Sequence, residues 1–409
     1  MEKFDLIIGG AGPAGCTLAL LLGRTGLKIA LIEKQCFPRD KICGDALSGQ
    51  VIRIMKRLPD NIYERFLSNI PKSSANGIRF TSPDFRSVDI PFHSTQNACI
   101  EDITGYVCRR RDFDLFLMNE VKRLSSVSVF EKTEIKGVSY TSNGIMASTN
   151  LGDFTARIVA AADGAQSVIR RSLHRDSMRV DHHCLGIRAY YDGVSGIHSQ
   201  RFIEMIFLRE ILPGYFWIFP GEGGITNVGF GMLIGSIRKQ RIQLSSLFQK
   251  LITEHSFLAP RFRHATLLGK PAAFPLPLGS HDIPRSIDRC LFLGDAASLV
   301  DPFTGEGIGN AMASAEIAAK IIMDHSDNDE FSSIFLEEYD RKIIVRMGNE
   351  LRISSLMQKM ANHPWIINLV IRKACHNPSL QELLSSMYLD EKIREKLTKP
   401  AFYTKLLLH

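Results

Sequence analysis

Hydrophobic and polar positions in the first 34 residues follow the order strand, turn, helix, strand. Residues 4–8 are a short apolar run, which suits a strand that is buried on both faces. A glycine-rich stretch and a mostly apolar helix come next, and residues 27–32 form a second apolar run. This alternation of strand and helix indicates an α/β protein with a parallel sheet.

Later segments depart from this pattern and then return to it. Residues 112–124 predict an amphipathic helix with apolar side chains on one face. Residues 127–162 predict short strands, and residues 184–234 predict a β-rich insert that is dense in aromatic side chains. Residues 291–322 repeat the strand, glycine turn and helix, and helices broken at prolines follow from residue 331.

The glycines of the first turn have the spacing G-x-G-x-x-G, at Gly10, Gly12 and Gly15. The first permits a tight turn, the second lets the backbone approach a pyrophosphate, and the third lets the helix pack closely on the sheet. The N-terminus of that helix offers free N–H groups to phosphates. Glu33 ends the second strand, where a carboxylate accepts hydrogen bonds from a ribose hydroxyl. The glycine motif is weak alone, but this context predicts a dinucleotide site.

The apolar start of the chain has a second interpretation, as a signal peptide or membrane anchor over residues 4–22. The first three residues carry no net positive charge, whereas a signal peptide begins with a basic segment. Glycines interrupt the apolar run, which also falls short of the ~20 residues that a spanning helix needs. We therefore expect a nucleotide-binding turn at this position.

Composition narrows the class of protein. The length of 409 residues exceeds what one simple core holds, so we expect two or three lobes. The hydrophobic fraction of 45% and the charged fraction of 23% are ordinary for a soluble globular chain. The net charge of +7 comes without basic runs interleaved with aromatic residues, so no nucleic-acid groove is expected.

The cysteines and histidines predict no metal site. Eight cysteines are scattered without C-x-x-C pairs, and with no secretory signal we expect reduced thiols and a cytoplasmic protein. His182, His183 and Cys184 come nearest to a metal cluster, but neighbours on a strand point to opposite faces.

Two further motifs place an acidic residue at the end of a predicted buried strand. Asp163-Gly164 follows one strand, and an Asp there faces the ligand crevice of an open α/β sheet. Taken alone, an ordinary Asp-Gly turn explains this motif better. Gly294-Asp295 follows another strand, and a small-residue helix begins near Gly307 with its free N–H groups directed at an anion.

The glycine fingerprint with Glu33, then Asp163-Gly164 and then Gly294-Asp295 together resemble the motifs of FAD-dependent oxidoreductases of the aromatic-hydroxylase superfamily. The resemblance extends over nearly the whole chain as far as residue 325. It implies FAD as the cofactor and three parts of the chain. These are a Rossmann-like FAD-binding domain of the GR2 type over 1–180 and 284–325, an inserted antiparallel β-sheet substrate domain over 181–283, and a helical region over 326–409.

Within that superfamily, three segments are similar to the geranylgeranyl reductase family, whose members reduce isoprenoid chains. They are residues 37–45, 214–220 and 302–308. The second segment overlaps a W-x-W-x-I-P motif of flavin-dependent halogenases, but Tyr215 replaces the first Trp and Phe219 replaces the Ile. That group's catalytic lysine is also not evident, so a halogenase is disfavoured.

The resemblance assigns roles by position. It places Lys41, Cys43 and Asp45 on a loop that crosses the flavin, as catalytic residues, although a buried structural role for Cys43 stays open. The expected cofactor-binding residues are Gly10, Gly12, Pro13, Ala14, Gly15, Glu33, Lys34, Arg39, Cys43, Gly44, Arg110, Asp163, Gly164, Gly294, Asp295, Pro302, Gly305, Gly307 and Ile308. The expected substrate-pocket residues are Tyr215, Trp217 and Phe219.

Three activities fit these residues. The favoured one is a reductase, in which reduced FAD delivers a hydride to a carbon–carbon double bond and a proton reaches the other carbon. The alternative is an FAD-dependent monooxygenase that hydroxylates an apolar or aromatic substrate and needs only a dry, enclosed flavin. A non-enzymatic electron carrier is disfavoured by the large aromatic insert. Only one dinucleotide fingerprint is present, so a transient donor, NAD(P)H, a protein or a quinol, must reduce the flavin.

The expected substrate is a long apolar molecule, such as an isoprenoid chain on a lipid or quinone, because an aromatic insert can line a pocket that buries hydrocarbon. Residues 364–373 place a Trp and aliphatic side chains before Arg372 and Lys373. Such a segment can rest on an anionic membrane surface. The favoured interpretation is an ordinary buried helix that closes the pocket, so the expected location is cytoplasmic, with peripheral membrane contact left open.

Overall fold

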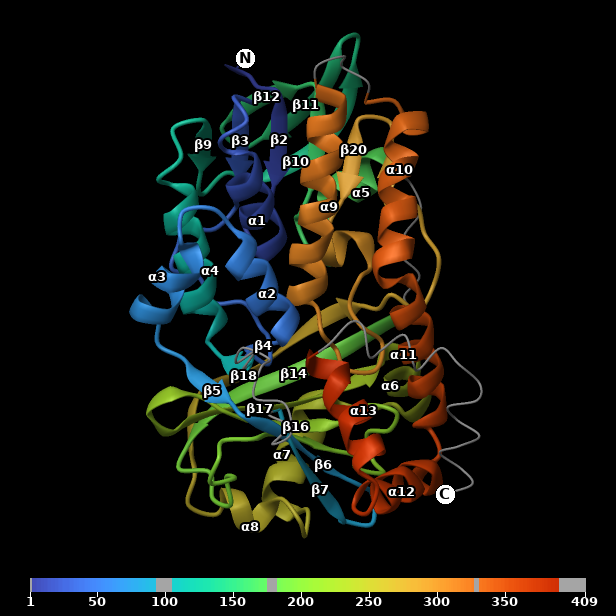
Figure 1. Ribbon diagram of the computed structural model, residues 1–409. Coiled ribbons are helices and arrows are strands. Elements are labelled where there is room, and N and C mark those ends of the chain that lie inside the picture. The colour runs from blue at the N-terminus through green and yellow to red at the C-terminus, as the bar shows by residue number, and fades with distance from the viewer. Residues whose placement is uncertain (1, 93–104, 175–181, 327–330, 390–409) are drawn as a thin grey trace.

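The computed structural model describes residues 2–92, 105–174, 182–326 and 331–389. Figure 1 shows two groups of strands along the length of the molecule, an upper group with helices around it and a wide sheet below. The C-terminal helices run down one side of both groups. The α/β fold class expected from the sequence is confirmed.

The upper group is built on a six-stranded sheet whose centre is the predicted first strand. β2 (Leu6–Gly9) pairs in parallel with β3 (Ile29–Ile32) and with β13 (Ile158–Ala161). The sheet continues to β9 (Val127–Phe130) at one edge, and to β20 (Cys290–Phe292) and the antiparallel β19 (Ser286–Ile287) at the other. Every residue of β2, β3, β13 and β20 is buried, as expected for parallel strands that are covered on both faces.

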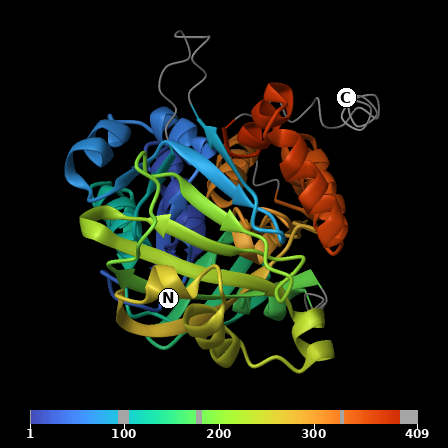
Figure 2. The same cartoon turned by 90° about the horizontal axis from the view of Figure 1, so that it is seen from below.

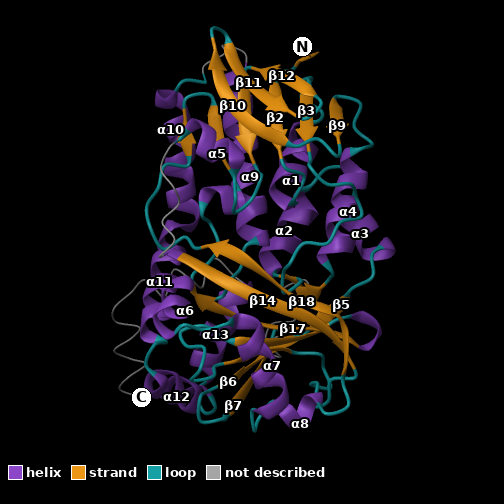
Figure 3. Ribbon diagram, turned by 180° about the vertical axis from the view of Figure 1, so that it is seen from behind, coloured by secondary structure: helices purple, strands orange, loops and turns teal. Residues whose placement is uncertain are grey.

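Helices and a small sheet cover the two faces of this parallel sheet. α1 (Pro13–Leu22) packs against α9 (Ile308–Ser326) and α4 (Arg110–Val121) on one face. The other face carries a four-stranded sheet, seen in front of β2 and β3 in Figure 3. Its strands are β1 (Glu2–Lys3), β10 (Ile135–Thr141), β11 (Gly144–Thr149) and β12 (Gly152–Ala156). The short helix α5 (Val168–Leu173) packs on β10.

The lower group is a seven-stranded sheet with the order β18-β14-β17-β16-β15-β6-β7. Its pairs are antiparallel except that β15 and β6 are parallel. The bounds are β6 (Gly77–Thr81), β7 (Ser87–Pro91), β14 (His183–Asp192), β15 (Ile203–Ile206), β16 (Phe216–Pro220), β17 (Ile225–Leu233) and β18 (Thr266–Pro277). Residues 77–91 therefore join this sheet, although the sequence places them in the FAD-binding domain.

The edge strand β18 was absent from the strands expected in the insert. It contains Pro271, Pro275 and Pro277, which argue against a strand in a sheet interior. Proline is tolerated at an edge, where one side of the strand needs no partner, and most of β18 is exposed. The sheet also carries α6 (Ile234–Gln240), α7 (Leu244–Glu254) and α8 (Ala259–Phe262), which the sequence analysis did not predict.

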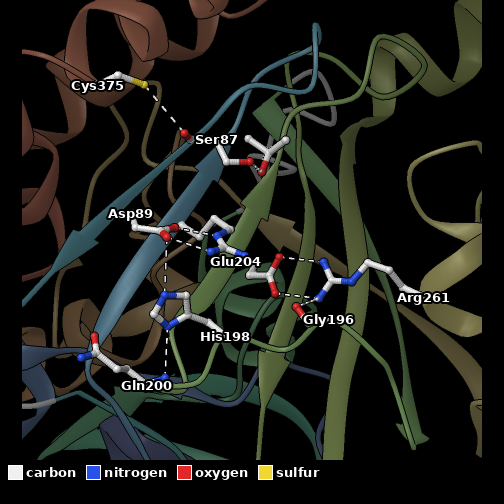
Figure 4. Close-up of polar contacts among 10 residues, drawn as sticks. Ser87, Asp89, Gly196, His198, Gln200, Glu204, Arg261 and Cys375 are labelled. Carbon is white, nitrogen blue, oxygen red and sulfur yellow. Dashed lines mark hydrogen bonds and ion pairs between the residues drawn. The ribbon is translucent and has the colours of Figure 1, made fainter.

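Charged pairs fasten the β6, β7 and β15 side of this sheet (Figure 4). Arg79 and Asp89 are cross-strand partners and form two hydrogen bonds of 2.6 and 2.7 Å. Glu204 is 1% exposed and binds Arg261 through two contacts of 2.7 Å. Because Arg261 lies in α8 and Glu204 on β15, this pair ties the short helix to the sheet.

The remaining elements connect the two groups. A three-stranded sheet of β4 (Ala46–Leu47), β5 (Ser73–Ala75) and β8 (Gly105–Val107) lies beside α2 (Gly49–Arg57) and α3 (Ile62–Asn69). The C-terminal helices are α10 (Ser333–Ile343), α11 (Asn349–Met360), α12 (Pro364–Ala374) and α13 (Pro378–Leu389), with a π-helical turn over Ile344–Gly348. Seen from below in Figure 2, these red helices stand beside the blue strands β6 and β7, and α12 and α13 contact β7.

Candidate functional site

One cavity of about 490 Å³ lies where the parallel sheet, the seven-stranded sheet and the C-terminal part of α11 meet. Its upper wall contains the first residues of α1 and α9 and the loops that follow β2, β3, β13 and β20. These are the carboxyl ends of the parallel strands, where α/β sheets bind ligands. Its lower wall is formed by side chains from β14, β16, β17 and β18.

The glycine turn has the shape that a pyrophosphate site requires. Gly10 has φ +97°, and a Cβ atom there would lie 2.4 Å from the carbonyl oxygen of Ala162. A Cβ at Gly15 would lie 1.9 Å from the carbonyl oxygen of Gly10, so only glycine allows α1 to begin here. A Cβ at Gly12 would have only one neighbouring atom within 4 Å, Arg39 Nη2 at 3.8 Å, so the backbone there faces open space. The N-cap of α1 has no side-chain hydrogen bond, which leaves its N–H groups available for an anion.

Glu33 is 6% exposed and joins the glycine turn to the loop that follows β3. Its Oε2 accepts a hydrogen bond from Ala11 N at 3.0 Å, and its Oε1 accepts one from Gln35 N at 2.9 Å. Arg39 Nε lies 3.6 Å from Glu33 Oε2. The carboxylate therefore has a structural role in addition to the ribose contact expected of it.

Arg110 and Arg39 share one buried acid, Asp114. The guanidinium of Arg110 forms two bonds to Asp114, at 2.7 and 2.8 Å, and also contacts the side chain of Cys43. Arg39 Nη1 lies 3.0 Å from the same carboxylate and is the arginine nearest the Gly12 turn. Arg110, which was expected to reach the FAD phosphates, lines the cavity and is paired with Asp114 in this structure.

Three titratable groups on the loop over residues 39–45 line the cavity and have shifted pKa values. Burial lowers the pKa of Lys41 to about 8, and its Nζ lies 2.9 Å from the centre of the Phe274 ring. Burial raises the pKa of the Cys43 thiol, and Arg110 opposes that shift. Burial also raises the pKa of Asp45 to about 6, against hydrogen bonds that favour its charged form.

Asp45 is 1% exposed and adopts φ +67°, a left-handed conformation that is uncommon outside glycine. Three donors hold its carboxylate: Tyr190 OH at 2.6 Å, Asn227 Nδ2 at 2.8 Å and Arg110 N at 3.2 Å. Tyr190 and Asn227 are cross-strand neighbours on β14 and β17. The loop that resembles the flavin-crossing segment is thereby fixed to the lower sheet.

The second and third acidic motifs occupy different positions on the upper wall. Asp163 accepts a hydrogen bond from Ile169 N at 3.1 Å, which holds the start of α5, and burial raises its pKa. Asp295 follows Gly294, whose φ is +56°, and also lines the cavity. The arrangement gives Asp163 a local structural role and places Asp295 beside the N-terminus of α9.

The loop before α9 is held from three directions. Asp301 Oδ1 accepts hydrogen bonds from Phe303 N at 2.9 Å and Thr304 N at 2.8 Å. Asp301 Oδ2 accepts one from Ser354 Oγ of α11 at 2.6 Å, and the hydroxyl of Tyr215 donates to the carbonyl oxygen of Thr304. The loop that includes Pro302, Gly305 and Gly307 is therefore rigidly placed along the cavity.

The aromatic wall follows from the two-residue period of β16. Phe216 and Ile218 point to the far side of the sheet and pack with α7, whereas Trp217 and Phe219 point into the cavity. Tyr215 precedes the strand and lies on the same side. Phe274, Leu276 and Leu278 extend the apolar wall and were not predicted, because the prolines of β18 argued against a strand there.

The sequence analysis also did not predict a role for Asp114 or Asn227, although Asp114 lies in the Arg-Arg-Asp-Phe-Asp segment that suggested Arg110.

All the expected site residues line this one cavity except Gly15, which lies beneath the turn. Their individual roles stay predictions.

Within the described residues, no group of three or more His, Cys, Asp or Glu side chains is arranged to hold a metal ion. His182 stacks on His281 at 4.2 Å and its Nδ1 lies 2.7 Å from Ser280 Oγ. None of the helices in the described part of the chain has the length and apolarity to cross a bilayer.

Comparison with known proteins agrees with this geometry. The family model described as FAD binding domain matches residues 3–223. A digeranylgeranylglycerophospholipid reductase of Thermoplasma acidophilum is 28% identical over 359 residues, which cover 84% of this chain and 84% of that protein. Conditioned medium factor receptor 1 of Dictyostelium discoideum is 27% identical over 371 residues, which cover 87% of this chain and 70% of that protein.

Among solved structures, a geranylgeranyl bacteriochlorophyll reductase-like protein from Thermoplasma acidophilum has the same fold, with a TM-score of 0.81. It is 21% identical, and the match covers 97% of this chain and 99% of that one. The likeness therefore includes the parallel sheet, the wide lower sheet and the C-terminal helices together.

Proposed function

This chain belongs to the FAD binding domain family, and we propose that it is a reductase that adds hydrogen across carbon–carbon double bonds of an isoprenoid or similar apolar chain. The observation that carries the proposal is the division of the cavity. Its upper end offers glycine backbone, helix N-termini and Glu33, whereas its lower end offers aromatic and aliphatic side chains. The loop of Cys43 lies between the two ends.

The upper end fits FAD residue by residue. The open backbone at Gly12 and the N-terminus of α1 would hold the pyrophosphate, Glu33 an adenosine ribose, and Asp295 with the start of α9 the flavin end. Both Arg39 and Arg110 are paired with Asp114, and Arg39, whose Nη2 lies nearest to the Cβ position of Gly12, is a candidate for the phosphates beside Arg110. When bound and reduced, FAD supplies the hydride.

The lower end fits hydrocarbon. Tyr215, Trp217, Phe219, Leu276 and Leu278 present apolar surface to the cavity. At ~0.8 kcal/mol for each buried CH₂ group, a few isoprene units gain ample affinity without polar contacts. Cys43 stays a neutral thiol because burial raises its pKa, so it can hold the proton that the second carbon takes up. With FAD and an apolar substrate bound, these walls would exclude water and so protect the reduced flavin from side reactions.

The electron donor is part of the proposal. The chain has one dinucleotide fingerprint, at Gly10–Gly15, so no second fold of this kind binds a nicotinamide permanently. NAD(P)H or a protein donor would reduce the flavin in a transient encounter. The relatives named as reductases favour double-bond reduction over the monooxygenase alternative.

We also propose that the C-terminal helices contact a membrane surface from which the substrate is taken. On α12, Ile367 and Ile371 are buried, but Trp365 is 65% exposed and Arg372 is exposed. Val345 and Leu356, at 85% and 54%, add apolar surface on the preceding helices. Binding to vesicles that contain anionic lipid, and its loss in Trp365→Ser, test this contact. The contact would be contradicted if the wild type did not sediment with the vesicles, or if Trp365→Ser sedimented with them to the same extent.

The test of the reductase is mass spectrometry of isoprenoid lipids after incubation with the protein and dithionite or NAD(P)H under anaerobic conditions. We expect products heavier by whole pairs of hydrogen atoms. Products that gain oxygen when air is admitted, or turnover confined to small polar aromatic compounds, would replace the reductase with the monooxygenase.

A further inference from the structure

The side chain of Asn227 on β17 bridges the Cys43 loop and the aromatic wall, although it does not itself line the cavity. It is 2% exposed. Its Nδ2 donates to the carbonyl oxygen of Cys43 at 2.8 Å and to Asp45 Oδ2 at 2.8 Å. Its Oδ1 accepts a hydrogen bond from Trp217 Nε1 at 2.9 Å. One amide thus touches both sides of the cavity wall where the two ends meet.

The chemistry of its partners allows only one orientation of this amide. The carbonyl of Cys43 and the carboxylate of Asp45 offer oxygen lone pairs, and an indole nitrogen can only donate. Turning the amide over would set oxygen against two oxygens and N–H groups against an N–H group. An aspartate of the same shape has no hydrogen to donate, so it meets the same conflict.

The strand register explains why one residue reaches both walls. Asn227 is the cross-strand partner of Tyr190 on β14 and of Phe219 on β16, so the three side chains share one face. Trp217 lies two residues from Phe219 and shares that face. A Cβ at Gly44 would lie 3.1 Å from the Phe219 ring, so the loop lies directly on the aromatic wall.

We propose that Asn227 is a positioning residue that sets the distance between Cys43 and the Trp217 ring, and through it the place of the reacting double bond. The proposal rests on the function above only in taking these two side chains to meet the substrate. Asn227 contacts the loop only at Cys43 and Asp45, so its loss should leave the glycine turn, Glu33 and Arg39 in place and change FAD binding little. A misplacement of the reacting groups by about 1 Å can cost about a hundredfold in rate.

The test compares the FAD-loaded wild type with Asn227→Asp. The first measurement is the rate of iodoacetamide alkylation of Cys43, resolved by peptide mass spectrometry, with Cys184 of the same cavity as internal reference. We expect roughly tenfold faster alkylation of Cys43 in Asn227→Asp and an unchanged rate at Cys184. We also expect kcat to fall by roughly ten- to a hundredfold while the Kd for FAD changes less than about twofold.

Tyr190→Phe is the matched control, because it removes another donor to Asp45 and leaves the three bonds of Asn227 in place. Its Cys43 should react within about twofold of the wild-type rate. If Asn227→Asp does not fold, Trp217→Phe keeps an aromatic ring but removes the indole N–H that binds the amide, and Cys43 should then react about threefold faster.

Wild-type alkylation of Cys43 in every folded variant would overturn the proposal, and so would an effect in Tyr190→Phe as large as that in Asn227→Asp. Alkylation of Cys43 can be measured without turnover, so it tests the role of Asn227 even if the wild type reduces no isoprenoid. Failure of the wild type to reduce any isoprenoid would overturn the reductase function instead.

Discussion

Replacing Glu33 by alanine separates the two roles that the structure gives its carboxylate. In the protein without FAD, the change removes two bonds from backbone N–H groups, at 3.0 and 2.9 Å. A hydrogen bond to a charged group contributes about 1.5–3 kcal/mol, and Gln35 is more exposed than Ala11, so we take the lower value for each. The free energy of unfolding of the apoprotein should therefore fall by about 3 kcal/mol.

The same change should weaken FAD binding by a further 1–3 kcal/mol, or roughly 5- to 150-fold in Kd, because ribose hydroxyls lose a charged partner. Urea denaturation of the apoprotein measures the first loss, and titration with FAD followed by flavin fluorescence measures the second. Glu131→Ala is the control, since Glu131 accepts a bond from Phe37 N at 2.8 Å but does not line the cavity. It should lower stability and leave the Kd for FAD unchanged. An apoprotein of wild-type stability in Glu33→Ala would refute the structural role, and a wild-type Kd would refute the ribose contact.

Three other changes test other parts of the molecule. Asp295→Ala should raise the Kd for FAD more than Asp163→Ala, because Asp163 accepts a hydrogen bond from Ile169 N whereas Asp295 lies beside the start of α9. Titration of both apoproteins with FAD compares the two Kd values. Glu204→Leu leaves Arg261 without its buried partner and should lower the free energy of unfolding by about 3 kcal/mol in urea, with an unchanged Kd for FAD. The pKa of Asp45 is raised by burial to about 6, so the folded state holds a proton that the unfolded state releases near pH 4, and stability falls as pH rises to about 6. Between pH 4.5 and 7.5 the wild type should lose about 2 kcal/mol relative to Asp45→Asn; a pH-independent difference would contradict this.

The upper end of the cavity was predictable because its signals are local. Gly10 needs φ +97°, and Gly15 admits no Cβ atom, so short-range geometry dictates the residue types. Glu33 lies at the end of the strand after the helix, and its distance along the chain from the glycines is set by one β-α-β unit. Such constraints leave a readable spacing in a single sequence.

The lower end was only partly predictable because its contacts are between distant residues. Asn227 joins Cys43 and Trp217, and nothing near it in sequence shows that its amide is committed to both. The prolines of β18 concealed an edge strand whose side chains complete the apolar wall. Arg110 shows the same limit, because the choice between a phosphate and Asp114 as its partner depends on how α4 faces the loop that carries Arg39.

The C-terminal helices have a direct part in shaping the site. Ser354 and Gln358 of α11 bind Asp301 Oδ2 at 2.6 Å and the carbonyl oxygen of Pro302 at 2.5 Å. That loop leads into α9, whose first residues line the upper end of the cavity. Leu356 of α11 and Trp365 of α12 are among the exposed apolar side chains proposed to meet a membrane. A shift of α11 would therefore move this loop, because two hydrogen bonds join them. Two hydrogen bonds thus join α11, which carries part of that exposed apolar surface, to a loop that lines the cavity.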